Sequence, residues 1–270
     1  MPAMSRPVAM AIGAHPDDIE FMMAGTLLLL KQAGYETHYM NLASGSCGSQ
    51  FHPPAQLRII RRREAQTAAK LLGAVFHPSL VDDMEIYYED KTLRRLAAVI
   101  REVAPTILLV PSPQDYMEDH VNTCRLAVSA AFVRGMNNYR TAPRRPPVPG
   151  DVTIYHAMPQ GLRDPLRRRI IPGAFVNTTA VFARKKAALA AHRSQQEWLA
   201  ETQKMNQYLA TMERFSREVG RLSRRFTHAE GWRRHLHWGY CAEEADPLRE
   251  ALGRNCLIHR AYERGLEMET

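Results

Sequence analysis

Strand-length apolar runs alternate with helical patterns through the first half of this 270-residue chain. The apolar runs cover residues 8–13, 37–42, 74–80 and 106–110, and the segments between them space their apolar residues as amphipathic helices do. Parallel neighbouring strands need a long crossover, which is usually a helix, so this alternation predicts a mostly parallel sheet with helices on both faces. The fold class expected is therefore α/β.

The same patterns predict the order of elements along the rest of the chain. Helices are expected over about 20–32, 54–72, 92–103 and 121–134, and later strands over 152–157 and 175–182. Residues 185–222 are mostly helical in pattern, and the tail from residue 227 onward is less clear. We expect one domain over residues 1–270, with residues 185–270 as a mostly helical C-terminal extension packed on it.

Composition narrows the class of protein further. The formal net charge is +8, but the arginines form short clusters with no aromatics between them, which favours a solvated basic surface over nucleic-acid binding. The four cysteines show no C-x-x-C pair, as expected for reduced thiols in the cytoplasm. Neither a signal peptide nor a transmembrane segment is predicted, because the densest helical apolar stretch, 21–30, is too short to span a bilayer.

Two polar clusters follow two of the expected strands. His15-Pro16-Asp17-Asp18 follows the first strand, and the cluster at 115–120 follows the strand at 106–110. If these strands are parallel, both clusters lie at the same edge of the sheet, where open α/β sheets bind ligands. One His and one Asp from the first cluster, with one His from the second, would make three protein ligands and leave a position for water, as a catalytic zinc site requires.

The first cluster also has a simpler interpretation. A turn followed by a helix is typical of such a tetrapeptide, with Asp17 or Asp18 as the N-cap of the helix that begins near Glu20. The residues alone leave both interpretations open.

Several segments, in order, resemble the LmbE-like, or PIG-L, family of de-N-acetylases. The first cluster resembles the family's signature, and residues 115–120 resemble its second metal motif. Further similarity lies at 61–64 with Leu72-Gly73, at 186–195 and at 229–232. The resemblance implies a Rossmann-like fold and one zinc ion held by His15, Asp18 and His120. It also implies that Asp17 is the general base for hydrolysis of an N-acetyl group on an amino sugar.

One position departs from the family's pattern. The second motif usually has a histidine three residues before the metal ligand, and here that position is Met117, whose thioether cannot donate a proton. Asp17 then works alone as base and acid, or another group such as Tyr116 or a distant histidine substitutes, or the protein binds metal and ligand without turnover. Asp119 either orients a zinc ligand from outside the coordination sphere or is a helix N-terminal acid.

Other residues are weaker candidates. The resemblance points to Arg61 as a substrate contact, with an ion pair to Glu64 or a solvated helix face as alternatives. Asp83, with its neighbour Asp82, and Tyr116 are further candidate substrate contacts. Cys124 lies one helical turn after His120 and would be a fourth ligand only at the expense of the open position.

The function expected is zinc-dependent removal of an N-acetyl group from an N-acetylglucosamine-type moiety of a small glycoside or glycolipid. Alternatives are a zinc amidase on another amide, such as a thiol conjugate of an amino sugar, a non-catalytic sugar- or metal-binding relative, and a nucleotide-binding α/β protein. Residues 44–49 form neither a G-x-G-x-x-G nor a P-loop pattern, which disfavours the last of these. The proline-rich loop 140–149 is expected to be extended and to shape the pocket, and a homo-oligomer is expected by analogy alone.

Overall fold

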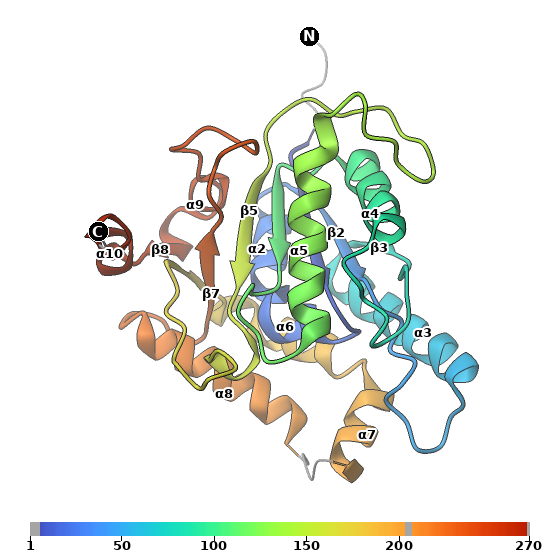
Figure 1. Cartoon of the computed structure of the whole chain (residues 1–270). Coiled ribbons are helices and arrows are strands. Elements are labelled where there is room, and N and C mark those ends of the chain that lie inside the picture. The colour runs from blue at the N-terminus through green and yellow to red at the C-terminus, as the bar shows by residue number, and fades with distance from the viewer. Residues whose placement is uncertain (1–5, 203–206, 269–270) are drawn as a thin grey trace.

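The computed structural model describes residues 6–202 and 207–268, which build one eight-stranded sheet in the order β3-β2-β1-β4-β5-β7-β6-β8. The strands from β3 to β5 pair in parallel, whereas β7, β6 and β8 pair antiparallel (Figure 1). The α/β class with a mostly parallel sheet is thus confirmed. The strands are β1 (Val8–Gly13), β2 (Glu36–Asn41), β3 (Val75–His77), β4 (Ile107–Val110), β5 (Thr153–Ala157), β6 (Ala174–Asn177), β7 (Ala229–Arg234) and β8 (Cys256–Ile258).

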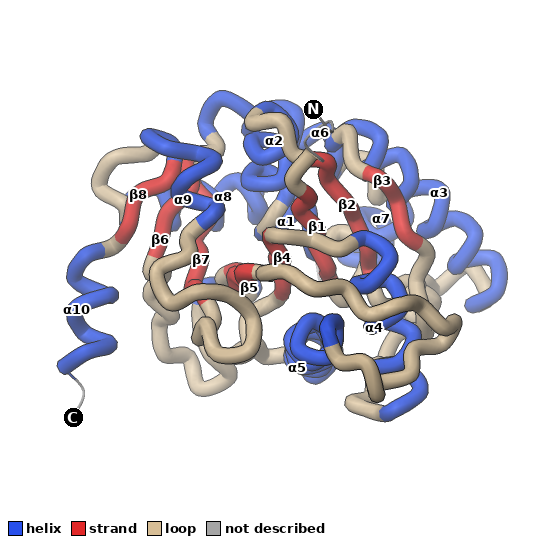
Figure 2. Tube along the Cα trace, turned by 90° about the horizontal axis from the view of Figure 1, so that it is seen from above, coloured by secondary structure: helices blue, strands red, loops and turns tan. Residues whose placement is uncertain are grey.

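Helices cover both faces of the sheet. Figure 2 shows α4 and α5 on one face and α2, α3 and α6 on the other. Successive side chains of β1 point to opposite faces of the sheet and so pack in both hydrophobic cores. Ala9 and Ala11 pack in one core, and Met10 and Ile12 pack in the other. The helices are α1 (Asp18–Met22), α2 (Ala24–Gln32), α3 (Pro54–Leu72), α4 (Asp90–Val103), α5 (Glu118–Phe132), α6 (Phe182–Leu189), α7 (Arg193–Thr202), α8 (Tyr208–Leu222), α9 (Pro247–Leu252) and α10 (Arg260–Met268).

Most expected elements are present, but several differ in their bounds; the strand expected over 74–80, for example, is only β3 (Val75–His77). The helix expected over 20–32 is two helices, α1 and α2, which meet at Met23. The strand expected over 175–182 ends at Asn177, because the next residues turn into a short 3-10 helix and then α6. The expected helical stretch 185–222 includes residues 203–206, which lie outside the described residues.

The C-terminal segment does more than pack on the domain. It forms α7, α8, α9 and α10, but it also contributes β7, which is inserted between β5 and β6, and the edge strand β8. β7 has the sequence AEGWRR, which lacks the apolar alternation that identifies strands. Trp232 in this strand is fully buried, and its indole N–H donates to Thr26 Oγ1 at 2.9 Å. Tertiary contacts therefore define this strand.

Glu230, also in β7, ties this strand to α2. Its two carboxylate oxygens accept the backbone N–H groups of Gly25 and Thr26 at 2.8 and 2.7 Å, which satisfies two free donors at the N-terminus of α2. Lys185 Nζ lies 2.6 Å from the same carboxylate, and both side chains are buried. A residue near the end of the chain thus caps a helix near its beginning.

The proline-rich loop does not lie at the candidate site, contrary to expectation. It follows the C-terminal end of α5 and contacts α4, where Arg145 bonds Glu102 and Arg101 bonds the Arg145 carbonyl. In Figure 1 it lies at the opposite end of α5 from the N-terminus of that helix. None of the described helices is long and apolar enough to cross a membrane.

Candidate metal centre

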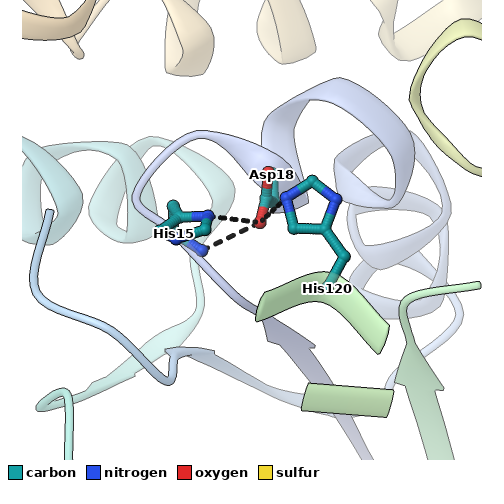
Figure 3. Close-up of side chains that lie close together, drawn as sticks. All are labelled: His15, Asp18 and His120. Atoms are coloured by element: carbon teal, nitrogen blue, oxygen red, sulfur yellow. Dashed lines mark hydrogen bonds and ion pairs between the residues drawn. The ribbon is translucent and has the colours of Figure 1, made fainter. Parts of the chain in front are cut away.

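Two loops from neighbouring parallel strands bring His15, Asp18 and His120 together. The first loop leaves β1, the second leaves β4 and leads into α5, and β1 pairs directly with β4. One ligand atom from each of the three side chains lies within 4.8 Å of the others (Figure 3). Within the described part of the chain this is the one group of three or more His, Cys, Asp or Glu residues close enough to hold a metal ion.

Each imidazole has one nitrogen held by a carboxylate and the other directed at Asp18. His15 Nε2 lies 2.9 Å from Asp119 Oδ2, and His120 Nδ1 lies 3.0 Å from Asp115 Oδ1. The remaining nitrogens, His15 Nδ1 and His120 Nε2, lie 3.7 and 3.4 Å from Asp18 Oδ2. Carboxylates that hold the far nitrogen of a metal-binding histidine fix its tautomer and ring orientation.

Asp18 is buried and held on several sides. Its Oδ2 accepts the backbone N–H groups of Ala14 and His15 at 3.0 and 2.8 Å, and its Oδ1 accepts the Gln160 side-chain amide at 3.3 Å. Burial opposes ionisation, but the two histidines outweigh it and hold the pKa of Asp18 far below its usual range. The carboxylate is therefore ionised at neutral pH.

The charges around the two imidazoles favour a cation between them. Burial lowers the pKa of His15, but its hydrogen bonds to Asp119 and Asp18 outweigh this and raise it to about 9. Burial likewise opposes the charged form of His120, yet Asp18 and Asp115 raise its pKa well above the usual value. Carboxylates that stabilise a proton on these rings also favour a divalent cation at the same place.

Asp17 lies in the same loop with a strained backbone. Its φ is 120° and its ψ is −25°, a conformation that residues with a side chain rarely adopt. It occupies the N-cap position of α1, yet its side chain makes no cap hydrogen bond, so the simpler helix-cap interpretation is wrong for Asp17. Asp18 lies within α1 and accepts amides that precede the helix, so the interpretation is wrong for it too.

The Asp17 side chain is buried and instead accepts a hydrogen bond from the Tyr208 hydroxyl at 2.6 Å. Burial and the nearby charge of Asp18 raise the pKa of Asp17 to about 7, against opposing contributions from His192, Tyr208 and Arg61. A carboxyl with a pKa near neutrality can both accept and return a proton.

Arg61 is buried in α3, and its Nη2 donates to the Gly48 carbonyl at 2.8 Å. A Cβ at Gly45 or Gly48 would lie within 2.5 Å of the Arg61 side chain, so the loop after β2 packs closely on it. Both alternatives for this residue are wrong: it is not solvated, and Glu64 instead accepts the backbone N–H and hydroxyl of Ser194.

The other candidate residues lie around the centre in different ways. Asp83 accepts the backbone N–H groups of Gly45 and Cys47 at 2.6 and 3.0 Å, so it holds the loop after β2. Tyr116 is exposed, with its ring edge-on to His120 at 5.9 Å between centroids. Cys124 Sγ lies 3.4 Å from His156 Nδ1 and is not part of the three-residue group.

Three residues at the centre were not predicted from the sequence. Asp115 lay within the second motif without a role, although a carboxylate five residues before a metal-binding histidine is a candidate partner for its ring. Gln160 follows β5, another parallel strand that ends at the same edge of the sheet, and that position is its only signal. Tyr208 carries no signal, since it lies 191 residues from the carboxylate that it contacts.

An open α/β sheet with a His-Asp-His group at the carboxyl ends of β1 and β4 defines the class of candidate metal-dependent enzymes. Comparison with known proteins agrees: the PIG-L family model, described as GlcNAc-PI de-N-acetylase, matches residues 10–131. Residues 10–131 are thus similar to the PIG-L family model, which confirms the resemblance found in the motifs of that segment.

Individual relatives include enzymes of two kinds. A 4-oxalmesaconate hydratase of Pseudomonas putida is 28% identical over 189 residues, which cover 67% of this chain and 71% of the relative. A diacetylchitobiose deacetylase of Thermococcus kodakarensis is 29% identical over 136 residues, which cover 48% of this chain and 51% of the relative. The structure of N,N'-diacetylchitobiose deacetylase from Pyrococcus horikoshii shares the fold, with a TM-score of 0.72 and 22% identity over 90% of this chain and 89% of that one. The relatives thus include deacetylases and a hydratase.

Proposed function

We propose that this protein is a zinc-dependent hydrolase that removes an N-acetyl group from an N-acetylglucosamine-type moiety of a small glycoside or glycolipid. The observation that carries the proposal is the convergence of His15, Asp18 and His120, with the buried carboxyl of Asp17 in the same loop. The family match and the deacetylase relatives support the reaction class.

The donor set suits zinc. Two imidazoles and one carboxylate are the nitrogen and oxygen ligands that catalytic zinc sites combine with a fourth, open position. Both imidazoles are oriented by carboxylates, so each presents one nitrogen toward Asp18. A zinc ion there would lower the pKa of water toward neutrality and stabilise negative charge on a carbonyl oxygen.

Asp17 is the residue for proton transfer in this mechanism. Its carboxylate takes a proton from water as the water oxygen bonds to the acetamide carbonyl carbon. The bond between that carbon and the nitrogen then breaks, and Asp17 returns the proton to the departing amine. Acetate and a free amino sugar are the products, so the proton balance closes with one carboxyl group.

Met117 occupies the position where the family's pattern has a histidine, so the usual second proton donor is missing there. Its thioether has no proton to give, and it occupies the N-cap of α5. Tyr116, whose ring stands edge-on to His120, is a candidate because it carries a hydroxyl. Burial and the charges of Asp18 and Asp115 raise the pKa of Tyr116 to about 12, so it keeps its proton at neutral pH. We propose that Asp17 is sufficient and that Tyr116 contacts the substrate.

A hydratase is the second candidate. The hydratase relative matches two thirds of this chain, and in addition of water to a double bond one carbon takes the hydroxyl while the other carbon takes the proton. Asp17 would take the proton from water as the water oxygen bonds to one carbon, and would return it to the other carbon. Arg61, buried beside the loop after β2, would then face a carboxylate of the substrate rather than a sugar hydroxyl.

A parallel assay separates these functions. Purified protein with one equivalent of zinc is tested for acetate release from N-acetyl sugars and for loss of absorbance of unsaturated dicarboxylates. Acetate release that disappears in Asp17→Asn supports the deacetylase. Turnover of the unsaturated acids alone supports the hydratase, and one bound zinc without either reaction supports a binding protein.

The proposal also covers the cellular location, the partners and the assembly of the protein. Its four cysteines are free thiols, which suits the reducing cytoplasm. We propose a small-molecule amino sugar as the partner, with no nucleic acid bound, and a homo-oligomer as the assembly to test by light scattering.

A further inference from the structure

One hydrogen bond joins the C-terminal helices to the proposed catalytic base. The hydroxyl of Tyr208, the first residue of α8, donates to Asp17 Oδ2 at 2.6 Å, and the side chains are 1% and 4% exposed. We infer that Tyr208 is a positioning residue that sets the orientation of the Asp17 carboxylate for proton transfer. This inference rests on the proposed function of Asp17.

Both partners of this bond are held from behind. The Tyr208 ring stands edge-on to Phe21, with 5.2 Å between centroids and 76° between planes. Asp17 has its strained backbone fixed at the start of α1, where its carbonyl accepts the Phe21 N–H at 3.0 Å. Because the Asp17 main chain and the Tyr208 ring are each fixed by their own contacts, the hydrogen bond between them sets the orientation of the Asp17 carboxylate.

The alternative partners of Asp17 explain why such a bond is needed. The side chains of Arg61 and His192 both interact electrostatically with the Asp17 carboxylate. Among the described residues, Arg61 Nε and His192 Nδ1 are buried without a hydrogen-bond partner, whereas His192 Nε2 lies 3.4 Å from Glu20 Oε1. An unheld carboxylate would turn toward these unpaired donors, since buried donors without a partner are costly. The Tyr208 hydroxyl bonds Asp17 Oδ2 and so keeps the Asp17 carboxylate from pairing with Arg61 or His192.

One oxygen held by Tyr208 leaves the other for water. A base acts only if the proton that it takes lies within hydrogen-bond reach in the right direction, and a misplacement of about 1 Å can cost a hundredfold in rate. The Tyr208 hydroxyl is therefore expected to matter for turnover more than for substrate binding.

The test is Tyr208→Phe, which removes only the hydroxyl and keeps the ring against Phe21. Tyr155 provides a matched control, because its buried hydroxyl donates to another carboxylate, Asp246 Oδ1, at 2.7 Å. In Tyr208→Phe we expect kcat to fall by roughly tenfold to a hundredfold. KM should change by less than about threefold and zinc content should stay at wild-type level. Tyr155→Phe should lower the thermal midpoint by about as much as Tyr208→Phe does, because each variant loses one hydrogen bond to a carboxylate. Unlike Tyr208→Phe, it should leave kcat unchanged.

A double-mutant comparison shows whether the effect passes through Asp17. In an Asp17→Asn background, Tyr208→Phe should cause no further loss of residual activity, because the carboxylate that it orients is gone. An equal further loss there, or a kcat within twofold of wild type in the single variant, overturns the inference.

Failure of the proposed function is recognised separately. If the wild-type protein releases no acetate, the Asp17 side-chain carboxyl is observed by 13C NMR at fixed pH in the metal-free protein, with Asp17→Asn for assignment. A changed chemical shift and a broadened line in Tyr208→Phe support the orienting contact without any assay of turnover. An identical spectrum in the two proteins overturns it.

Discussion

Asp119 Oδ2 lies 2.9 Å from His15 Nε2, although the two residues are 104 positions apart in the sequence. The same oxygen accepts the backbone N–H of Met84 at 2.8 Å, at a residue whose φ is 62°. The carboxylate thus holds a proposed metal ligand and the loop after β3 at once. This arrangement is more specific than a charge placed in the first turn of a helix.

Removal of this carboxylate is predicted to weaken metal binding. In Asp119→Ala, His15 loses the partner that fixes its tautomer, and zinc affinity should fall by about tenfold to a hundredfold. Competition with a chromogenic chelator measures the change. Glu118→Ala is the control, since Glu118 is also acidic, lies in the same first turn of α5 and is exposed. Equal affinity losses in the two variants would show that Asp119 acts only through the helix dipole.

Loss of the proposed base is predicted to separate metal binding from turnover. Asp17→Ala should abolish hydrolysis, a loss of at least about a hundredfold, because Asp18, Asp115 and Asp119 are engaged with the two histidines. Zinc should remain bound at about one equivalent, since His15, Asp18 and His120 are unchanged. Metal analysis and acetate release on the same sample measure both quantities, and full activity in this variant would rule out Asp17 as the base.

The buried pair of Lys185 and Glu230 is predicted to be essential for stability. Lys185→Ala leaves the Glu230 carboxylate buried without its cation, which typically costs about 3 to 5 kcal/mol in unfolding free energy. Urea denaturation followed by circular dichroism measures this. Lys186→Ala is the matched control, because the next residue of α6 makes a half-exposed pair with Glu213. We expect that control to cost less than about 1 kcal/mol, and equal costs would refute the prediction.

His156 is predicted to make folding sensitive to acid. Burial, and next the neighbouring charges of His235 and Arg233, lower the pKa of His156 to about 3, although the Pro111 carbonyl opposes this. The thiol of Cys124, the other titratable group against the ring, stays protonated because burial raises its pKa to about 12. Between about pH 6.5 and 3 the unfolded chain therefore binds a proton here that the folded chain does not.

Stability should therefore decrease as pH falls through that window, by up to about 1.4 kcal/mol per pH unit from this residue. The contribution of His156 to stability is fully present above pH 6.5, where its ring is neutral in both the folded and the unfolded state. Urea midpoints measured from pH 7 to pH 4 should fall less steeply in His156→Gln than in the wild-type protein. The same slope in both would contradict the prediction.

Much of the α/β core and the metal centre could be derived from the chain itself. The predicted helix over 54–72 coincides with α3, since Pro54 begins it and Gly73, with a φ of 71°, ends it. Local patterns suffice for such elements because capping residues and apolar spacing act within a few residues. That the two loops meet followed from one further rule, that neighbouring parallel strands end at the same edge of a sheet. The choice of Asp18 rather than Asp17 as the ligand beside His15 and His120 came from the resemblance to the PIG-L family.

The tertiary structure alone decided the features that depend on partners far along the chain. β7 is a strand because β5 and β6 flank it, and Glu230 caps α2 from more than 200 residues away. The contact between Tyr208 and Asp17 is of the same kind. A sequence records the period and chemistry of its residues directly, whereas which distant groups meet is settled only when the whole core packs and every buried donor must find an acceptor.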